Sequence, residues 1–251
     1  MSSARADAEC IFIAGMRGSG KSTRVQHLIG QAPRVVCFDP TGQYGRPPRA
    51  RGYGWPVAAT LPELHATVSP RWHGPPWRAA LIVAGDFELE LHKLSVYLWH
   101  AQAPYESGRD RKKLTLIVEE MDLAVPNHAT PKGLGGFKRL VLQGRHRGVE
   151  VIGVTQHPAL VPTWFRINCA ERYLFALGVE DHAVMGTRYR DELARLTPHR
   201  FIRFADGAAT SGGNPPLGSA ADGGSRSGAG APAPHQVKPT KGGKTTVPWR
   251  R

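Results

Sequence analysis

The sequence predicts an α/β fold with a mostly parallel, twisted sheet and helices on both of its faces. Short apolar runs alternate with segments of helical periodicity along most of the chain, which is the succession expected of parallel strands joined by helical crossovers. Several runs, such as Leu114–Val118, are apolar at nearly every position, as is typical of strands covered on both faces. A chain of 251 residues is long enough for one such domain followed by a tail.

The expected strands are apolar runs bounded by turn residues. They cover Glu9–Ala14, Arg34–Phe38, Ala79–Ala84, Leu114–Glu119, Glu150–Thr155, Arg172–Leu177 and Arg200–Phe204. Helices are expected where apolar residues recur with helical spacing. They cover Ser22–Ile29, Phe87–Gln102, Pro131–Arg147 and Glu180–Leu196.

Two stretches interrupt this alternation. Residues 42–78 are rich in Pro, Gly and Arg, with at most one short helix around Leu61–Val68, and such a long insertion is often functional. Its tryptophans, Trp55, Trp72 and Trp77, are expected to cover apolar surface, with stacking on single-stranded bases as the alternative. From 207 to 251 the chain is dominated by Gly, Ala, Ser and Pro, a composition that predicts a disordered basic tail. The predicted domain is therefore 1–206.

Composition restricts the classes of function. A formal net charge of +13 favours contact with a polyanion, nucleic acid before a membrane surface. The tail from Asp206 carries six Lys or Arg and two Asp, which leaves about +9 in the rest of the chain. Three cysteines without a C-x-x-C pair suggest buried thiols rather than disulfides or a zinc site. With no apolar run of about 18 residues and no signal-peptide pattern, we expect a cytoplasmic protein.

A glycine-rich loop follows the first expected strand and predicts nucleotide binding. Residues Gly15, Met16, Arg17, Gly18, Ser19, Gly20, Lys21 and Ser22 fit the pattern G-x-x-x-x-G-K-[ST]. Between a strand and a helix, the backbone N–H groups of this loop, up to Thr23, form a cradle for phosphate. Lys21 is then expected to contact the β- and γ-phosphates, and the Ser22 hydroxyl to bind Mg²⁺.

Acidic and amide side chains follow two later strands. Glu119 and Glu120 come directly after Leu114–Val118, and Gln156 follows Glu150–Thr155. Open α/β sheets place ligands at the carboxyl ends of parallel strands. We assign Glu119 to Mg²⁺ and Glu120 to the attacking water, with Asp122 as the reserve for either role. An amide at Gln156 is suited to sense the γ-phosphate and position the same water.

These motifs, in this order, resemble the HerA/FtsK superfamily of DNA-pumping ATPases. The resemblance rests on Gly15–Ser22, Phe38-Asp39-Pro40, Val118-Glu119-Glu120 and the segment from Gly144 to Gln156. The last is the most specific, since Arg145, Gly148, Thr155 and Gln156 fit the superfamily pattern. The resemblance spans Glu9 to Phe204. One departure is Glu119, at a position where Asp is commoner.

The resemblance implies a RecA-like P-loop core that forms a ring, expected to be a hexamer, with ATP and Mg²⁺ held between subunits. A neighbouring subunit would contribute an arginine, for which Arg145 and Arg172 are the candidates and Arg147 the reserve. The compact size is most like viral genome-packaging ATPases of tailless icosahedral, membrane-containing viruses. These would package double-stranded DNA and contact capsid or packaging-vertex proteins, in the host-cell cytoplasm or at the vertex of the virion.

Basic side chains in two regions are candidates for contact with DNA phosphates. They are Lys132, Lys138 and Arg139, and Arg46, Arg49 and Arg51 in the insertion. Two alternatives remain open at this point. The first is a filamentous-phage assembly ATPase, zonula occludens toxin-like, or a conjugation-type ATPase acting on single-stranded DNA. The second is a nucleotide-binding switch or small-molecule kinase.

Overall fold

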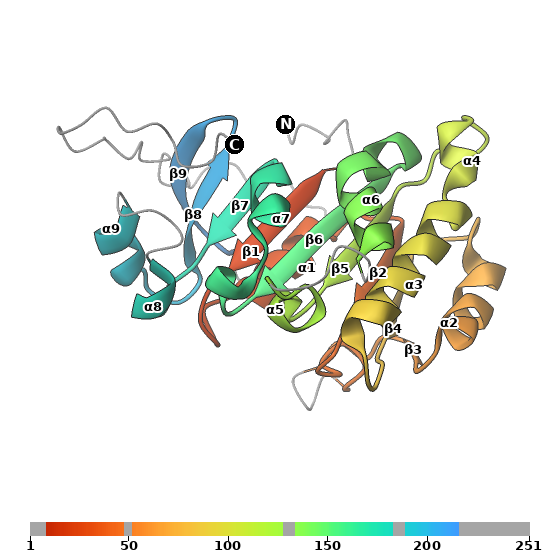
Figure 1. Cartoon of the computed structure of the whole chain (residues 1–251), viewed down its shortest axis with the longest axis horizontal. Helices are drawn as coiled ribbons and strands as arrows, with labels where there is room; N and C mark the ends of the chain where they lie inside the picture. Colours follow the sequence, from red (N-terminus) through yellow and green to blue (C-terminus); the bar gives the residue numbers. More distant parts are fainter. Residues whose placement is uncertain (1–8, 48–51, 128–133, 183–188, 216–251) are drawn as a thin grey trace, which may run out of the picture.

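In the computed structural model, residues 9–47, 52–127, 134–182 and 189–215 are described, and they build one sheet with helices against both faces (Figure 1). Within these ranges the sheet has nine strands in the order β3-β4-β2-β5-β6-β1-β7-β8-β9. Their bounds are β1 Cys10–Ala14, β2 Arg34–Phe38, β3 Val57–Ala58, β4 Trp77–Leu81, β5 Leu114–Val118, β6 Val149–Thr155, β7 Glu171–Leu174, β8 Arg200–Ala205 and β9 Ala208–Gly213.

In the sheet order, the strands from β3 to β7 pair in parallel, and within the described residues β8 pairs antiparallel with both β7 and β9. The predicted α/β class with a mostly parallel sheet is confirmed. β1 lies between β6 and β7, and β6 lies between β1 and β5. The carboxyl ends of β1, β5 and β6 therefore lie side by side at one edge of the sheet.

The helices are mostly short and occupy the crossovers between strands. They are α1 Lys21–Leu28, α2 Leu61–Val68, α3 Phe87–Ala101, α4 Ala103–Glu106, α5 Met121–Ala124, α6 Gly135–Gln143, α7 Thr163–Asn168, α8 Val179–His182 and α9 Arg190–Ala194. Within the described ranges, none of them combines the length and the apolar character that a membrane span needs.

Most strands divide their side chains between two apolar clusters, one on each face of the sheet. On β1, Phe12 joins the cluster formed with α2, α3, α6 and α7, which lie in front of the sheet in Figure 1. The neighbouring Ile11 and Ile13 join the second cluster with Val25 of α1. Strands buried on both faces explain the uninterrupted apolar runs in the sequence. The three cysteines are free and buried, as expected.

The aromatic residues of the insertion pack against these clusters. Trp77 is buried and lies 5.6 Å from Trp72, ring centre to ring centre. Trp55 packs on Tyr44, which is fully buried on the second face. The prediction that these tryptophans cover apolar surface is confirmed, and so is the short helix at Leu61–Val68.

The structure corrects several boundaries. β4 begins at Trp77 and ends at Leu81, earlier than the predicted Ala79–Ala84, and β7 ends at Leu174 rather than Leu177. Of the predicted helix Pro131–Arg147, α6 and a 3-10 turn over Gly144–Arg147 are described, and 131–133 lie outside the described residues. The predicted helix Glu180–Leu196 is described only as α8 and α9, with 183–188 outside.

The predicted start of a disordered tail at 207 is wrong for residues 208–213, which form β9. β9 carries no apolar alternation, and its backbone pairs with β8 along its whole length. Asp206 and Gly207 connect the two strands with φ angles of 51° and 76°, the left-handed values that a two-residue hairpin turn needs. Residues 216–251 of the predicted tail lie outside the described residues.

Candidate active site

The glycine-rich loop connects β1 to α1 at the carboxyl edge of the sheet, as predicted. Gly18 and Gly20 have φ angles of 76° and 107°, a backbone that side chains with a Cβ rarely adopt. No side chain caps the N-terminus of α1 and no acidic residue occupies its first turn, so its backbone N–H groups remain available. The Ser19 hydroxyl oxygen is buried and has no hydrogen-bond partner among the described residues. These features fit a bound phosphate group.

Lys21 lies within the loop, where its Nζ donates to the backbone oxygens of Gly15 and Met16 at 2.6 and 3.0 Å. Burial lowers the pKa of the Lys21 ammonium, and the negative charges of Glu119, Glu120 and Asp122 act in the opposite direction. The three acids predicted from the sequence therefore lie around the predicted phosphate-binding lysine.

Glu119 is buried at the end of β5 and is held by a residue of the insertion. The Tyr44 hydroxyl donates to Glu119 Oε1 at 2.7 Å, and the Tyr44 backbone N–H donates to Asp39 Oδ2 at 2.7 Å. Burial raises the pKa of the Glu119 carboxyl from 4.5 to about 7. The Tyr44 hydrogen bond and Lys21 oppose this increase, while the charges of Asp39 and Glu120 add to it.

Glu120 and Gln156 are in direct contact. Gln156 Nε2 donates to Glu120 Oε1 at 2.7 Å, which joins the ends of the paired strands β5 and β6. Glu120 has a φ of 42°, uncommon for a residue with a long side chain, and such conformations concentrate at functional sites. The structure thus brings together the two side chains predicted to orient the attacking water.

Thr155 connects the loop to the acidic turn. Its hydroxyl donates to Asp122 Oδ1 at 2.6 Å and accepts from the His157 backbone N–H at 3.0 Å. Its backbone oxygen accepts from the Gly15 N–H at 3.3 Å. Asp122, the reserve candidate, is therefore engaged by the strand that carries Gln156.

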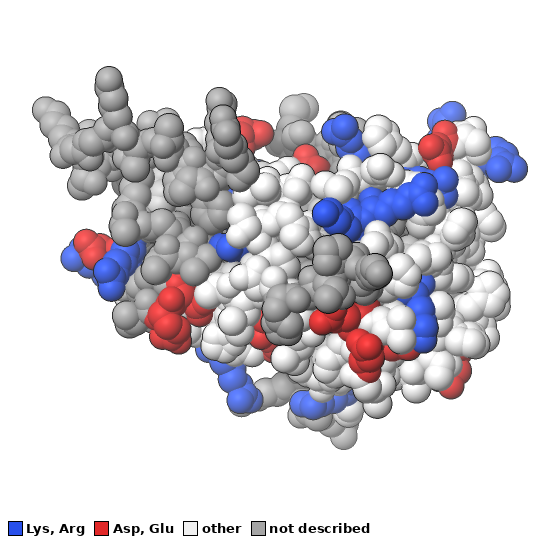
Figure 2. Space-filling model, viewed as in Figure 1, with Lys and Arg blue, Asp and Glu red and all other residues white. Residues whose placement is uncertain are grey.

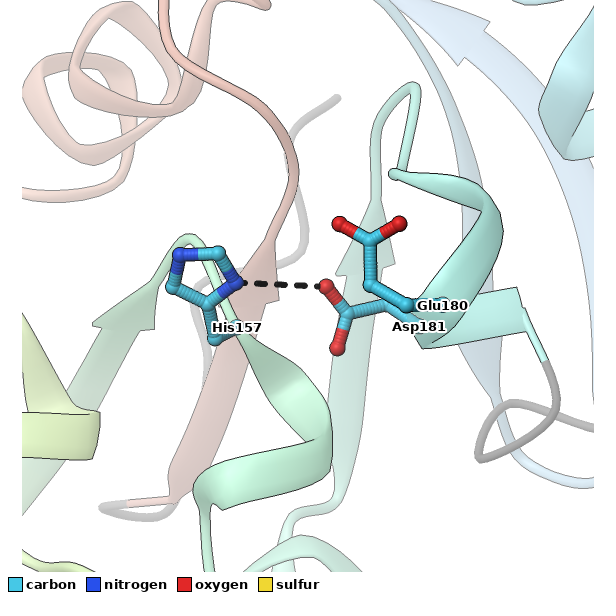
Figure 3. A group of neighbouring side chains, drawn as sticks. All are labelled: His157, Glu180 and Asp181. Atoms are coloured by element: carbon cyan, nitrogen blue, oxygen red, sulfur yellow. Dashed lines mark ion pairs between the residues drawn. The ribbon is translucent and has the colours of Figure 1, made fainter.

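His157 follows Gln156 along the chain and lies beside two acidic residues (Figure 3). His157 Nδ1 lies 3.5 Å from Asp181 Oδ2, with Glu180 beside them. The other Asp181 oxygen accepts from the Ala159 backbone N–H at 3.1 Å. These contacts attach the segment after β6 to α8.

The two candidate arginines lie at different levels of the sheet. Arg145 is exposed in the turn that precedes β6, at the amino edge of the sheet. β6 covers seven residues, about 20 Å at roughly 3.3 Å per residue, and separates Arg145 from Gln156. Arg172 is half-buried on β7, with its guanidinium 6.0 Å from the Phe204 ring centre. Burial lowers the pKa of Arg172.

Arg147, the reserve arginine, makes its described contacts within this chain. It donates to the Trp99 backbone oxygen at 2.6 Å and pairs with Glu106 at 2.9 Å. Its guanidinium also lies 4.1 Å from the Trp99 ring centre. These contacts favour a structural role for Arg147.

The predicted DNA-contacting residues are only partly described. Lys138 and Arg139 are exposed on α6, and Arg139 also lies over Trp99. Arg46 donates to the Thr41 backbone oxygen. Lys132, Arg49 and Arg51 lie outside the described residues.

No sequence pattern predicted Tyr44 as the partner of Glu119. Asp39 was noted within a motif, but its function in the turn was not. The fully buried Asp39 accepts from the Thr41 N–H, the Thr41 hydroxyl and the Tyr44 N–H, and so holds the turn that brings Tyr44 to Glu119. An Asp directly after a buried strand is the signal that could have drawn attention to this turn.

Comparison with solved structures shows which proteins share this architecture. The genome packaging NTPase B204 from Sulfolobus turreted icosahedral virus 2, in complex with sulfate, matches with a TM-score of 0.61 at 13% identity, over 84% of this chain and 98% of B204. The chain has the fold of a genome-packaging ATPase. The DNA-packaging ATPase B204 from Sulfolobus turreted icosahedral virus gives a TM-score of 0.56 at 14% identity, over 78% and 92% of the two chains.

The same ATPase fold occurs in VirB4 of Thermoanaerobacter pseudethanolicus, with a TM-score of 0.54 at 13% identity, over 83% of this chain and 90% of VirB4. No protein-family model matches the sequence, and no curated protein matches it. At these identities the likeness is one of fold.

Proposed function

We propose that the chain is an Mg²⁺-dependent ATPase that translocates double-stranded DNA into a preformed viral capsid. The observation that carries the proposal is the Gln156–Glu120 contact at 2.7 Å, at the edge of the sheet that holds the glycine-rich loop. A carboxylate and an amide together are suited to orient and deprotonate a water for attack on a phosphoryl group.

The other residues of the site are assigned to the phosphates, the attacking water and Mg²⁺. The loop N–H groups and Lys21 bind the phosphates, and the Gln156 amide orients the water without adding charge. Glu120 accepts the proton of that water. Ser22 and Glu119 offer the oxygen ligands that Mg²⁺ prefers, and the ion when bound neutralises charge on the phosphates. B204 has been solved with AMP, AMPPCP and ATP-gammaS, which supports a nucleotide as the ligand.

The position of Arg145 supports a ring in which subunits share their sites. It lies at the amino edge of the sheet, about 20 Å from its own Gln156 along β6, so it reaches a nucleotide only in a neighbouring subunit. A trans arginine stabilises charge on the transferred phosphoryl group. Head-to-tail contacts form rings when the rotation between subunits closes, and we propose a hexamer.

The charge of the surface supports DNA as the polymer that is moved. Figure 2 shows Lys and Arg side chains gathered over the region of α6 and α4, while Asp and Glu gather nearer α5 and α8. Lys138 and Arg139 are exposed on α6, and side chains of this kind bind phosphates without reading sequence. The proposal places the protein in the host-cell cytoplasm or at the packaging vertex, in contact with capsid proteins.

An ATPase assay tests the proposal. The full chain with Mg²⁺ and ATP should release phosphate, and double-stranded DNA should increase the rate. Lys21→Ala should abolish turnover, largely through lost ATP binding. Lys93→Ala is the matched control, because Lys93 makes only an exposed ion pair with Glu90 among the described contacts.

The same assay separates the alternatives. Stimulation by single-stranded DNA alone would favour an assembly or conjugation-type ATPase, the reading with which the VirB4 fold is also compatible. A rate of hydrolysis that neither form of DNA changes, over a range of salt concentrations, would favour a nucleotide-binding switch or kinase.

A further inference from the structure

The open end of the β8–β9 hairpin lies against the back of the glycine-rich loop. The residue before β8, His199, donates its backbone N–H to the Ser19 oxygen at 2.8 Å. The residue after β9, Asn214, donates its side-chain Nδ2 to the Gly20 oxygen at 2.8 Å. Asn214 also donates its backbone N–H to the His199 oxygen at 2.9 Å. Two residues from one hairpin thus contact two successive carbonyls of the loop, and the second of these also accepts from the Arg24 backbone N–H at 3.0 Å in α1.

The planarity of the peptide bond gives these contacts a consequence for phosphate binding. In a trans peptide the C=O of one residue and the N–H of the next point in opposite directions, and the described residues contain no cis peptide. Fixing the Ser19 oxygen toward the hairpin turns the Gly20 N–H away from it. Fixing the Gly20 oxygen does the same for the Lys21 N–H. These N–H groups are among those that cradle phosphate in such a loop.

The local backbone indicates that this contact is tightly determined. His199 has a φ of 66°, a left-handed conformation that costs a non-glycine residue free energy and persists only when its surroundings impose it. A Cβ placed on Gly20 would lie 2.9 Å from both Asn214 Nδ2 and His199 Nδ1. The loop and the hairpin therefore fit each other only with glycine at position 20.

We propose that the β8–β9 hairpin is a clamp that orients the phosphate-binding N–H groups of the loop, with Asn214 and His199 as positioning residues. Asn214 acts through its side-chain amide and His199 through its backbone N–H. The inference deepens the proposed function, on which its relevance to ATP rests. It also assigns a role to a strand that lies beyond the predicted domain boundary.

Amide hydrogen exchange of the peptide that contains Gly15–Ser22, measured on the full chain without nucleotide, tests the clamp. Asn214→Ala and Asn214→Asp both remove the donor, and each should increase exchange in this peptide about fivefold, the effect of losing one typical hydrogen bond. Asn168→Ala is the matched control, since Asn168 also donates an amide to a backbone oxygen, that of Trp164 at 2.6 Å, on an exposed helix end. Equal exchange in wild type and both Asn214 variants would overturn the clamp.

His199→Gly distinguishes the role of the His199 backbone N–H from that of its side chain. Glycine keeps the N–H and accepts a φ of 66° without strain, so loop exchange should stay at the wild-type rate. Exchange as fast as in Asn214→Ala would contradict the role assigned to the His199 backbone.

Titration with Mg²⁺ and AMPPCP connects the clamp to the nucleotide. Asn214→Ala should bind this analogue about fivefold more weakly, and should raise KM for ATP with little change in kcat. Its melting temperature should fall no further than that of Asn168→Ala. Affinity equal to that of wild type would show that the clamp does not act on phosphate binding. If the wild-type chain binds no AMPPCP, the proposed function fails, and the exchange rates alone decide whether the hairpin holds the loop.

Discussion

Gln156 and Glu120 form a hydrogen-bonded pair, with 2.7 Å between Nε2 and Oε1, at the ends of the neighbouring strands β6 and β5. The donor is neutral and the acceptor is a carboxylate, so the pair presents one basic oxygen held by one amide. Because Lys21 of the glycine-rich loop is influenced by the same carboxylate, phosphate and water would meet at this edge of the sheet.

Glu120→Gln should separate binding from hydrolysis. The variant should retain ATP, because Lys21 and the loop are unchanged, and should lose about a hundredfold or more in kcat, the usual effect of removing a general base. ATP binding and phosphate release measured on the same sample check this. Glu88→Gln on α3 is the control. If Glu120→Gln loses binding and hydrolysis equally, Glu120 belongs to the metal instead.

Glu119 should make the metal-free chain less stable as the pH rises. The pKa of its carboxyl is about 7 in the folded chain and near 4.5 otherwise, so between these values the unfolded chain loses its proton first and the free energy of unfolding falls. Glu119→Gln has no carboxyl to titrate, so its free energy of unfolding should not fall in this way. Urea unfolding with a chelator present checks this. Between pH 4.5 and pH 8 the free energy of unfolding of the variant should rise relative to that of the wild type, by about 3 kcal/mol at most. A gain that does not depend on pH would contradict a buried, titrating Glu119.

Thr155→Val should loosen the connection between the loop strand and the acidic turn. The substitution keeps the side-chain shape in a fully buried position but leaves Asp122 Oδ1 and the His157 N–H without their shared hydroxyl. The expected cost is about 1–3 kcal/mol in the free energy of unfolding, with a lower kcat. Thr67→Val is the control, because the exposed Thr67 hydroxyl bonds only within α2 among the described contacts. Equal costs for the two variants would remove any special role for Thr155.

Arg145→Ala should affect hydrolysis, whereas Arg147→Ala should affect stability. Arg145 is exposed, so its loss should leave stability nearly unchanged, while hydrolysis falls about a thousandfold if it is the trans arginine. Arg147 contacts Trp99 and Glu106, so its loss should lower the melting temperature.

Mixed rings test whether Arg145 acts in trans. Subunits carrying Arg145→Ala and subunits carrying Lys21→Ala, each inactive alone, should regain partial hydrolysis when assembled together. Recovery is expected because some interfaces then combine an intact loop with an intact arginine. No recovery, in rings shown to contain both subunits, would assign the arginine elsewhere, with Arg172 as the next candidate.

The parallel core and the loop were predictable because each depends on local sequence. β1, β2 and β5 are buried on both faces, so an uninterrupted apolar run marks them, and the loop needs glycine where φ is positive. Gln156 and Glu120 were predicted to share an edge from strand direction alone. Their contact confirms only that they are neighbours, and their chemical roles remain predictions.

Features that depend on tertiary contacts were missed. β9 is a strand because its backbone pairs with β8, although its small residues resemble a linker. The dipeptide Asp206-Gly207 was the available signal, since Asp-Gly favours a two-residue hairpin turn. Tyr44 reaches Glu119 from 75 residues away in the sequence, and no periodicity encodes such a contact.

Hydrolysis at the Glu120–Gln156 pair should move the protein along double-stranded DNA. Displacement of a third strand from a triplex at the end of a duplex measures this movement directly. With Mg²⁺ and ATP, the wild-type chain should release the third strand, and Glu120→Gln should bind the same duplex without releasing it. Full ATP hydrolysis by the wild-type chain with no strand release, or equal release by Glu120→Gln, would contradict DNA translocation driven by this pair.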